Sequence, residues 1–196
     1  ASTAPANKFS VGGQVSTVDG AGLLRLATNN VITAQSFGVQ NVTGSTAVQS
    51  VGTLYLGLAT TINTDSGAVG LVRDNGTIRY PAGTTNPVLT IRSSDGAGRS
   101  GDWKIGSRSS SYFTTNTAIV DLVSGVAGAG ALDAQIGTLK IADEGYCLTT
   151  SCVLNGKLQM GGGLLDVTNL ILGMKSSVAT QSLATVNATF IQTNGG

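Results

Sequence analysis

Histidine is absent from this chain of 196 residues, charged residues make up only 11% of it, and aromatic residues only 5%. Without histidine, Ser/His/Asp and Cys/His catalytic groups are excluded. The sequence has only 2 cysteines, so a zinc site of the Cys/His type is excluded as well. Its carboxylates are scattered rather than clustered. We therefore expect no metal, no cofactor and no enzymatic activity.

Lysine and arginine number 11 against 10 acidic residues, and no basic run reaches three residues. A nucleic-acid partner is therefore not expected. No apolar run approaches the length of a membrane-spanning helix. Hydrophobic residues reach 41% at a net charge of +1, which argues against a disordered chain. Low charge also leaves little electrostatic repulsion against self-association.

Glycine, of which there are 28, and β-branched residues dominate what is present, a composition that favours short strands between tight turns. Asp-Gly and Asn-Gly pairs, each compatible with a hairpin turn or with a solenoid corner, occur at positions that include Asp19-Gly20, Asn75-Gly76, Asp95-Gly96 and Asn155-Gly156. The predicted strands are Leu23–Leu26, Val31–Ala34, Thr53–Leu56, Ala68–Val72, Thr77–Tyr80, Val88–Ile91, Trp103–Ile105, Ala118–Val123, Gly137–Ile141, Lys157–Met160, Leu164–Val167, Leu170–Leu172 and Ala188–Gln192.

A short unit recurs along the chain: glycine, a spacer, then an apolar, a variable and a second apolar residue. It begins at Gly52, Gly76, Gly137 and Gly156, and Asn169–Gly173 ends in the same way. Such recurrence indicates stacked coils. We expect an internal column of Leu54, Ile78, Leu139, Leu158 and Ile171, and stacked amide ladders of asparagines near the turns. The predicted fold is an all-β, right-handed parallel β-solenoid with irregular side loops. A β-sandwich subunit of the pilin type is the alternative.

Three stretches carry a resemblance to a known family: Leu54–Tyr80, Asn86–Gly106 and Gly163–Gly173. They resemble the passenger regions of autotransporter-associated β-strand repeat proteins, over roughly residues 50–196. The resemblance implies a β-solenoid, export to the cell surface, and adhesive or matrix roles. It implies no catalytic residues.

The polar residues 1–13 read as a flexible arm, followed by one solenoid domain over 14–196. The chain starts without methionine, which fits either a mature form after removal of a signal peptide or a piece cut from a longer protein, and we expect an extracellular location. The C-terminal strand has no polar cap, so either the chain is a fragment of a longer array or its bare strand edges dock on another copy. We therefore predict an extracellular structural protein that stacks head to tail into a fibre. The candidate assembly residues are Ala1, Phe9, Val11, Phe190 and Ile191.

Side loops carry the remaining candidates. Cys147 and Cys152 are predicted to close a small loop by a disulfide in an oxidising compartment. The loop with Tyr112 and Phe113 is either a ligand-binding loop or a cover on the solenoid. The densest polar cluster, of Asp65, Arg92, Asp95, Arg99 and Asp102, is either a glycan-binding or lyase-like groove or a solvated set of turns. An adhesin that binds surface glycans is accordingly the alternative function.

Overall fold

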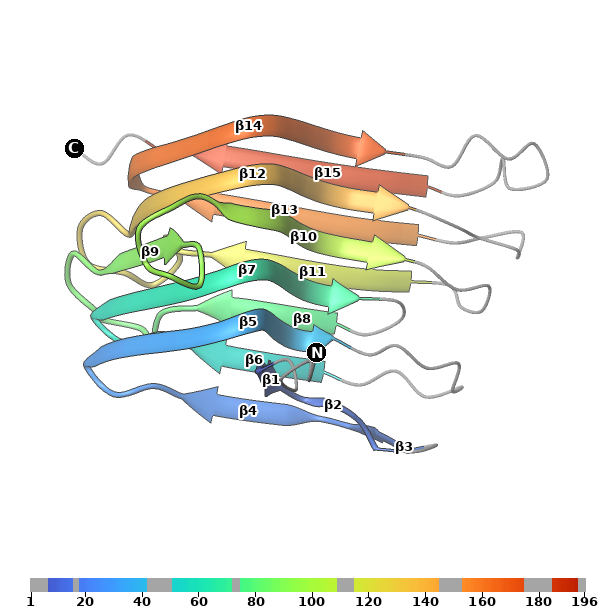
Figure 1. Cartoon of the computed structure of the whole chain (residues 1–196), viewed down its shortest axis with the longest axis horizontal. Coiled ribbons are helices and arrows are strands. Elements are labelled where there is room, and N and C mark those ends of the chain that lie inside the picture. The colour runs from blue at the N-terminus through green and yellow to red at the C-terminus, as the bar shows by residue number, and fades with distance from the viewer. Residues whose placement is uncertain are drawn as a thin grey trace, which may run out of the picture.

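The computed structural model describes residues 7–15, 18–41, 51–71, 75–108, 115–144, 153–174 and 185–193. Strands in this part of the chain alternate between two stacked parallel sheets (Figure 1). The short sheet contains β4 (Gly22–Arg25), β6 (Val51–Tyr55), β8 (Asn75–Arg79), β11 (Thr115–Asp121), β13 (Val153–Met160) and β15 (Thr185–Gln192). The long sheet contains β1 (Lys8–Val11), β5 (Asn29–Asn41), β7 (Ala59–Leu71), β9 (Val88–Arg92), β10 (Ser100–Arg108), β12 (Ala131–Glu144) and β14 (Gly162–Met174).

Each coil is one strand of the short sheet followed by one strand of the long sheet, which is the pattern of a parallel β-solenoid. The predicted fold class is thus confirmed, and the antiparallel β-sandwich alternative is wrong. One antiparallel pair occurs among the described residues, β2 (Gly13–Val15) with β3 (Val18–Gly20). Asp19-Gly20 lies in β3, and Asn155-Gly156 lies within β13, so neither pair forms a hairpin turn.

The core of the short sheet is a column of side chains, one from each coil. Its members are Leu24, Leu54, Ile78, Val120, Leu158 and Phe190. Leu54 and Ile78 are no more than 1% exposed, and burial of such a side chain contributes roughly 1.5–3 kcal/mol. The predicted column is confirmed for three members and wrong for two. Leu139 faces the core from the long sheet, and Ile171 pairs with Lys140 on that sheet's outer row.

The strands of the long sheet bend in the middle (Figure 1). In β5 the inward residues are Ala34 and then Phe37, so two consecutive residues, Gln35 and Ser36, face outward between them. In β12 the two-residue interval lies between Ile136 and Leu139, both buried. Regular alternation would place only one residue there. The shift turns each long strand around a corner, so one strand covers two sides of the core.

A second corner is formed by a stack of residues with positive φ. Each follows directly after an inward apolar residue of the long sheet, and the set is Gly12, Gln40, Gly70, Gly106, Ala142 and Gly173. Here the backbones of the two sheets touch. A Cβ on Gly76 would lie 2.4 Å from the backbone nitrogen of Gly70, and a Cβ on Gly156 would lie 2.5 Å from that of Ala142. In the repeats that begin at Gly52, Gly76 and Gly156, the opening glycine therefore marks this close approach between the sheets.

The third coil is interrupted by a side loop. Ile91 pairs with Ala134 and Ser100 with Ile136, so residues 92–99 stand where β12 has Gln135 alone. The loop leaves the long sheet just before the first corner, and β9 and β10 continue the sheet on either side of it. The irregular spacing of the sequence repeat has its physical reason here, since a loop can leave between two strand segments without disturbing their ladders.

Within the segment predicted as an arm, Lys8–Val11 form β1 in register on Ser36–Val39 of β5. The rings of Phe9 and Phe37 stack with their centroids 5.3 Å apart. Residues 8–11 are therefore a strand of the long sheet in this structure. The apolar pair Phe9 and Val11 supplies the reason, because both side chains follow the inward rows of β5.

Candidate functional site

The C-terminal end of the solenoid presents open strand edges. Among the described residues, β14 and β15 each have one strand neighbour, β12 and β13 respectively. Leu170 and Leu172 stack on Leu139 and Ile141. The two lower residues are 1% and 0% exposed, whereas Leu170 and Leu172 are 41% and 48% exposed. The end coil thus has the apolar pattern of an interior coil, with one side uncovered.

Edge strands are usually protected by charges, proline or bulges. In β14 the one charged side chain is Asp166, and β15 has none. Asp166 is itself bound to Arg99, whose Nη2 lies 2.7 Å from Oδ2 of the carboxylate. The end coil therefore has no unpaired charged side chain in β14 or β15 that would oppose pairing. Its strand edges and apolar side chains are suited to pairing with another strand.

Three of the predicted assembly residues lie on inward columns at the two ends. Phe9 and Val11 continue the columns of Phe37 and Val39 at the N-terminal end, and Phe190 lies above Leu158 at the other. Ile191 pairs with Gln159 on the outer row of the short sheet. Ala1 lies outside the described residues. Sequence reasoning missed Leu170 and Leu172, although their alternation with Ile171 was a readable signal.

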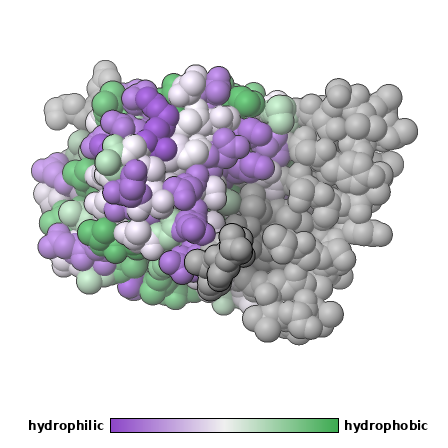
Figure 2. Space-filling model, viewed as in Figure 1, coloured by the Kyte–Doolittle hydropathy of each residue, from purple (hydrophilic) through white to green (hydrophobic). Residues whose placement is uncertain are grey.

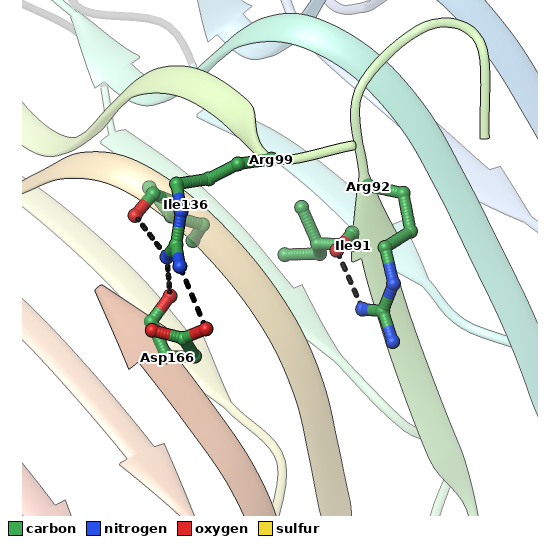
Figure 3. Close-up of polar contacts among 5 residues, drawn as sticks. All are labelled: Ile91, Arg92, Arg99, Ile136 and Asp166. Atoms are coloured by element: carbon green, nitrogen blue, oxygen red, sulfur yellow. Dashed lines mark hydrogen bonds and ion pairs between the residues drawn. The ribbon is translucent and has the colours of Figure 1, made fainter. Parts of the chain in front are cut away.

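The predicted polar cluster is divided into separate contacts. Arg92 donates from Nη1 to the carbonyl oxygen of Asp133 at 2.9 Å, and its Nη2 lies 2.7 Å from that residue's carboxylate. Arg99 binds Asp166 in the same way, with Nη1 donating to its carbonyl oxygen at 2.7 Å and to that of Ile136 at 3.1 Å. Figure 3 shows these two arginines at opposite ends of the side loop, with Arg99 reaching across to Asp166. Arg92 thus holds one end of the loop on the next coil, and Arg99 holds the other end on the next two coils.

Two aspartates of the cluster, Asp65 and Asp95, accept hydrogen bonds from backbone amides of the loop. Oδ1 of Asp95 accepts from the amides of Ala97 and Gly98 at 2.9 and 3.2 Å, and also from the Ser93 hydroxyl. The Ser93 hydroxyl and these amides lower the pKa of Asp95 to about 2. Asp65 accepts from the Ser94 amide at 3.1 Å. Most of the carboxylates are therefore engaged, which favours the interpretation as an ordered turn over that as a groove.

Asp102 lies apart from the loop contacts. It lines an open hollow of 290 Å³ together with Ser36, Ser66, Gly67 and Lys104 on the outer face of the long sheet. Figure 2 shows hydrophilic and hydrophobic residues interspersed over the face turned to the viewer. In the described part of the chain, no group of three or more Asp, Glu, Cys or His residues is placed to hold a metal ion.

The predicted asparagine ladder forms on the short sheet. The Asn187 amide donates to Oδ1 of Asn155 at 2.8 Å, and the Asn155 amide donates to the Thr117 hydroxyl at 3.3 Å. The backbone amide of Thr117 donates to Oδ1 of Asn75 at 2.7 Å. Four successive coils are thus joined by side chains as well as by backbone, and this ladder also runs to the last strand.

A second stack on the same face was not predicted. The guanidinium carbon of Arg25 lies 4.2 Å from the ring centroid of Tyr55, and that of Arg79 lies 4.8 Å from it. Arg79 also donates to the Tyr55 hydroxyl. Both ring contacts are with arginines of adjacent coils, so Tyr55 links three successive coils through its side chain.

Four predicted residues lie outside the described part of the chain: Cys147 and Cys152 of the expected disulfide, and Tyr112 and Phe113 of the expected ligand loop. Their predictions remain as stated. Among the helices and strands that the structure describes, no helix has the length and apolar character needed to cross a membrane.

Comparison with known proteins does not assign the chain to a family. No protein-family model, no curated protein and no solved structure matches the chain. The solenoid is thus the part of the family resemblance that the structure supports.

Proposed function

We propose that this chain is an extracellular structural protein whose solenoids stack head to tail into a surface fibre or matrix filament. The observation that carries the proposal is the uncovered end coil, where Leu170 and Leu172 repeat the apolar positions of buried residues below them. Pairing with a further coil would hydrogen-bond the open edges of β14 and β15 and bury these side chains.

The partner in this proposal is another copy of the chain. Successive coils already hold each other by ladder pairing, side-chain columns and the asparagine ladder. A second copy offers the same cross-section. Head-to-tail contact is heterologous and continues without closing, so it yields a filament. The proposal assigns no catalytic step, no cofactor, no nucleic acid and no membrane-spanning part.

The extracellular location is part of the same proposal. Its support is the low charge of 11%, the predicted Cys147–Cys152 disulfide, and the resemblance to exported β-strand repeat proteins. Export through a cleaved signal peptide belongs to it too.

Sedimentation velocity and negative-stain electron microscopy over a concentration series test the assembly. The parent chain should form filaments, and the double variant Leu170→Lys/Leu172→Lys should remain monomeric, because charges would enter the apolar joint. Leu164→Lys is the matched control. Leu164 is on the same strand and 59% exposed, but it pairs with Asp133 in an outward row. This control should assemble. A parent chain that stays monomeric with an intact circular dichroism spectrum would refute the proposal.

A second candidate function, an adhesin segment that binds a surface glycan, is favoured by the hollow beside Asp102. A carboxylate and the Lys104 ammonium at its rim are suited to sugar hydroxyl groups. Glycan-array binding that is lost in Asp102→Asn would support this function. The absence of binding by the parent chain, in either assembly state, would leave the structural role alone.

A further inference from the structure

One outward row of the short sheet contains an arginine–tyrosine stack, formed by Arg25, Tyr55 and Arg79. Arg25 of β4 pairs with Tyr55 of β6, and Tyr55 pairs with Arg79 of β8. The two guanidinium carbons lie 4.2 and 4.8 Å from the ring centroid, one from each neighbouring strand. Both arginines are exposed, whereas the tyrosine is partly buried between them. Two positive charges are therefore held on one ring by strands that are two spacings apart, roughly 10 Å.

The two charges of the stack have no counterion among the described residues. The arginines of the side loop each lie 2.7 Å from an aspartate carboxylate, but neither Arg25 nor Arg79 has such a partner in the described part of the chain. Asp121 pairs with Arg79 in the ladder, yet its Oδ1 accepts from the amides of Val123 and Ser124 at 3.1 and 2.9 Å. An anion beside the stack would be attracted by both guanidiniums at once.

The ring also prepares the guanidiniums for a ligand. Stacking uses the flat face of a guanidinium and leaves the N–H groups at its edge free to donate. Arg79 donates to the Tyr55 hydroxyl, and Arg25 makes no hydrogen bond within the chain that the structure describes. The remaining N–H groups form a fork that matches the oxygens of a carboxylate or a similar oxyanion. Because both side chains are already held, less conformational entropy is lost on binding.

An open hollow of 220 Å³ lies at the corner that follows the stack, where β4 turns into β5 and β6 into β7. This corner is at the left of Figure 1. Ala27, Leu58 and Pro81 line the hollow, and each comes two or three residues after a member of the stack. Thr28 and Thr84 line it as well. Apolar side chains with a few polar groups suit a sugar ring, which has an apolar face of C–H groups and a polar edge.

We propose that the arginine–tyrosine stack and this hollow bind an acidic polysaccharide. Its carboxylate or sulfate groups accept hydrogen bonds from the two guanidiniums, and the sugar ring that carries such a group lies in the hollow. The site belongs to the short sheet and the corner after it, and it shares no residue with the hollow beside Asp102. This binding goes beyond the proposed fibre, because it requires only a single copy of the chain.

The stack favours an acidic polysaccharide over a nucleic acid. Single strands bind by stacking their bases on open aromatic faces. The Tyr55 ring is instead contacted by a guanidinium from each neighbouring strand. Duplex DNA is held by many phosphate contacts along a broad basic surface. In the described strands of the short sheet, Lys157 is the one basic residue outside the stack.

Affinity electrophoresis of the full chain at low salt measures this binding. The gels contain polygalacturonate, which carries carboxylates, heparin, which adds sulfate groups, or uncharged dextran. The parent chain should be retarded by an acidic probe and not by dextran, and the probe that retards it more identifies the preferred anion. Arg25→Gln/Arg79→Gln should weaken the binding by about tenfold or more, because charge-assisted hydrogen bonds are lost. Circular dichroism checks that the variant is folded.

The matched control is Lys8→Gln/Lys104→Gln, which removes the same charge from outward positions of the long sheet. It should bind as the parent does. This control also removes Lys104 from the hollow beside Asp102, so it separates the two sites. An equal loss of binding in both double variants would overturn the proposal, because it would show attraction to net charge alone.

A second variant, Ala27→Asp, tests the site without removing an arginine. Ala27 is exposed and lines the hollow, so a carboxylate there would repel an acidic sugar and should abolish the retardation. Ala82→Asp, at an exposed position outside the hollow, is its control and should bind. A folded parent chain that binds neither acidic probe would refute the site. Equal binding of single-stranded DNA, lost in Arg25→Gln/Arg79→Gln, would refute the polysaccharide as its ligand. Either result leaves the fibre proposal standing, since none of these measurements requires filaments.

Discussion

The rings of Phe37 and Trp103 stack with their centroids 5.6 Å apart and their planes inclined by 27°, although β7 runs between their strands. The residue of β7 at this level is Gly67, which pairs with Phe37 on one side and with Trp103 on the other. Without a side chain there, the indole occupies the space of the missing residue. The aromatic column thus continues from Phe9 through Phe37 to Trp103.

Gly67→Ala should destabilise the monomer by about 1–3 kcal/mol, because overpacking forces a rigid ring to move. The new Cβ would lie 2.3 Å from the Trp103 ring. Trp103 is the single tryptophan, and its Nε1–H donates to the Ser100 hydroxyl at 2.8 Å. If the new Cβ displaces the ring from this buried site towards water, the tryptophan fluorescence should shift to the red. Urea unfolding and emission spectra check this. Gly162→Ala, where nothing lies within 4 Å, is the control and should change neither. Equal stability of the two variants would contradict the packing.

The positive-φ stack predicts opposite effects at two of its positions. Gly106→Ala should cost about 1–2 kcal/mol, because an L side chain is strained at the φ of 71°. Ala142→Gly, at φ 57°, should stabilise the chain by less than about 1 kcal/mol, since relief of strain exceeds the added entropy of the unfolded chain. Urea unfolding in the Leu170→Lys/Leu172→Lys background separates stability from assembly. A stabilising Gly106→Ala would be inconsistent with this corner.

The asparagine ladder predicts graded losses. Asn155→Ala removes the hydrogen bonds to Thr117 and from Asn187 and should cost about 1–2 kcal/mol. Asn187→Ala removes one of them and should cost about half as much. Thr189→Ala, two residues along β15 on the outer row, should stay within about 0.5 kcal/mol of the parent. Thermal unfolding of the three variants in the monomeric Leu170→Lys/Leu172→Lys background gives the order of the stability losses. An Asn155→Ala variant as stable as the parent would show that the ladder contributes no stability.

The hydrogen bonds that the Asp95 carboxylate accepts within the side loop should be lost only at very low pH. The folded pKa of Asp95 lies at about 2, below the ordinary 3.8. Because the folded pKa is depressed, the stabilisation is complete above the ordinary pKa and is lost as pH falls through about 2. The amide resonances of Ala97 and Gly98 should therefore shift with a midpoint near pH 2. Asp95→Asn should abolish this titration, and a midpoint near pH 4 would show that the carboxylate does not accept from these amides.

Much of the architecture was predictable from local patterns. The recurrent glycine with two alternating apolar residues correctly located strands such as β6, β8 and β13 and indicated parallel stacking. β-Branched residues and scarce charge excluded a helical or disordered chain. The asparagine ladder was predictable too, because parallel coils in register must bring equivalent residues together.

The candidate site was predicted less completely. Phe9, Val11 and Phe190 were recognised as apolar residues at bare ends, whereas Leu170 and Leu172 were missed, because the sequence analysis placed Ile171, which lies between them, in the core column. The polar cluster was a cluster only in sequence, because Arg92 and Arg99 bind Asp133 and Asp166 on later coils. Partners that far along the chain leave no local signal.

The sequence by itself determined that this chain forms short strands with inward apolar pairs, since alternation and glycine spacing are local properties. Only the tertiary structure decided which sheet each strand joins. Gly52 and Gly137 open the same pattern, yet Gly52 meets the backbone of Gln40 between the sheets and Gly137 lies at a corner of the long sheet. The bend of the long strands arises from contacts between coils. Those contacts exist only once the coils are stacked, and therefore no window of sequence contains them.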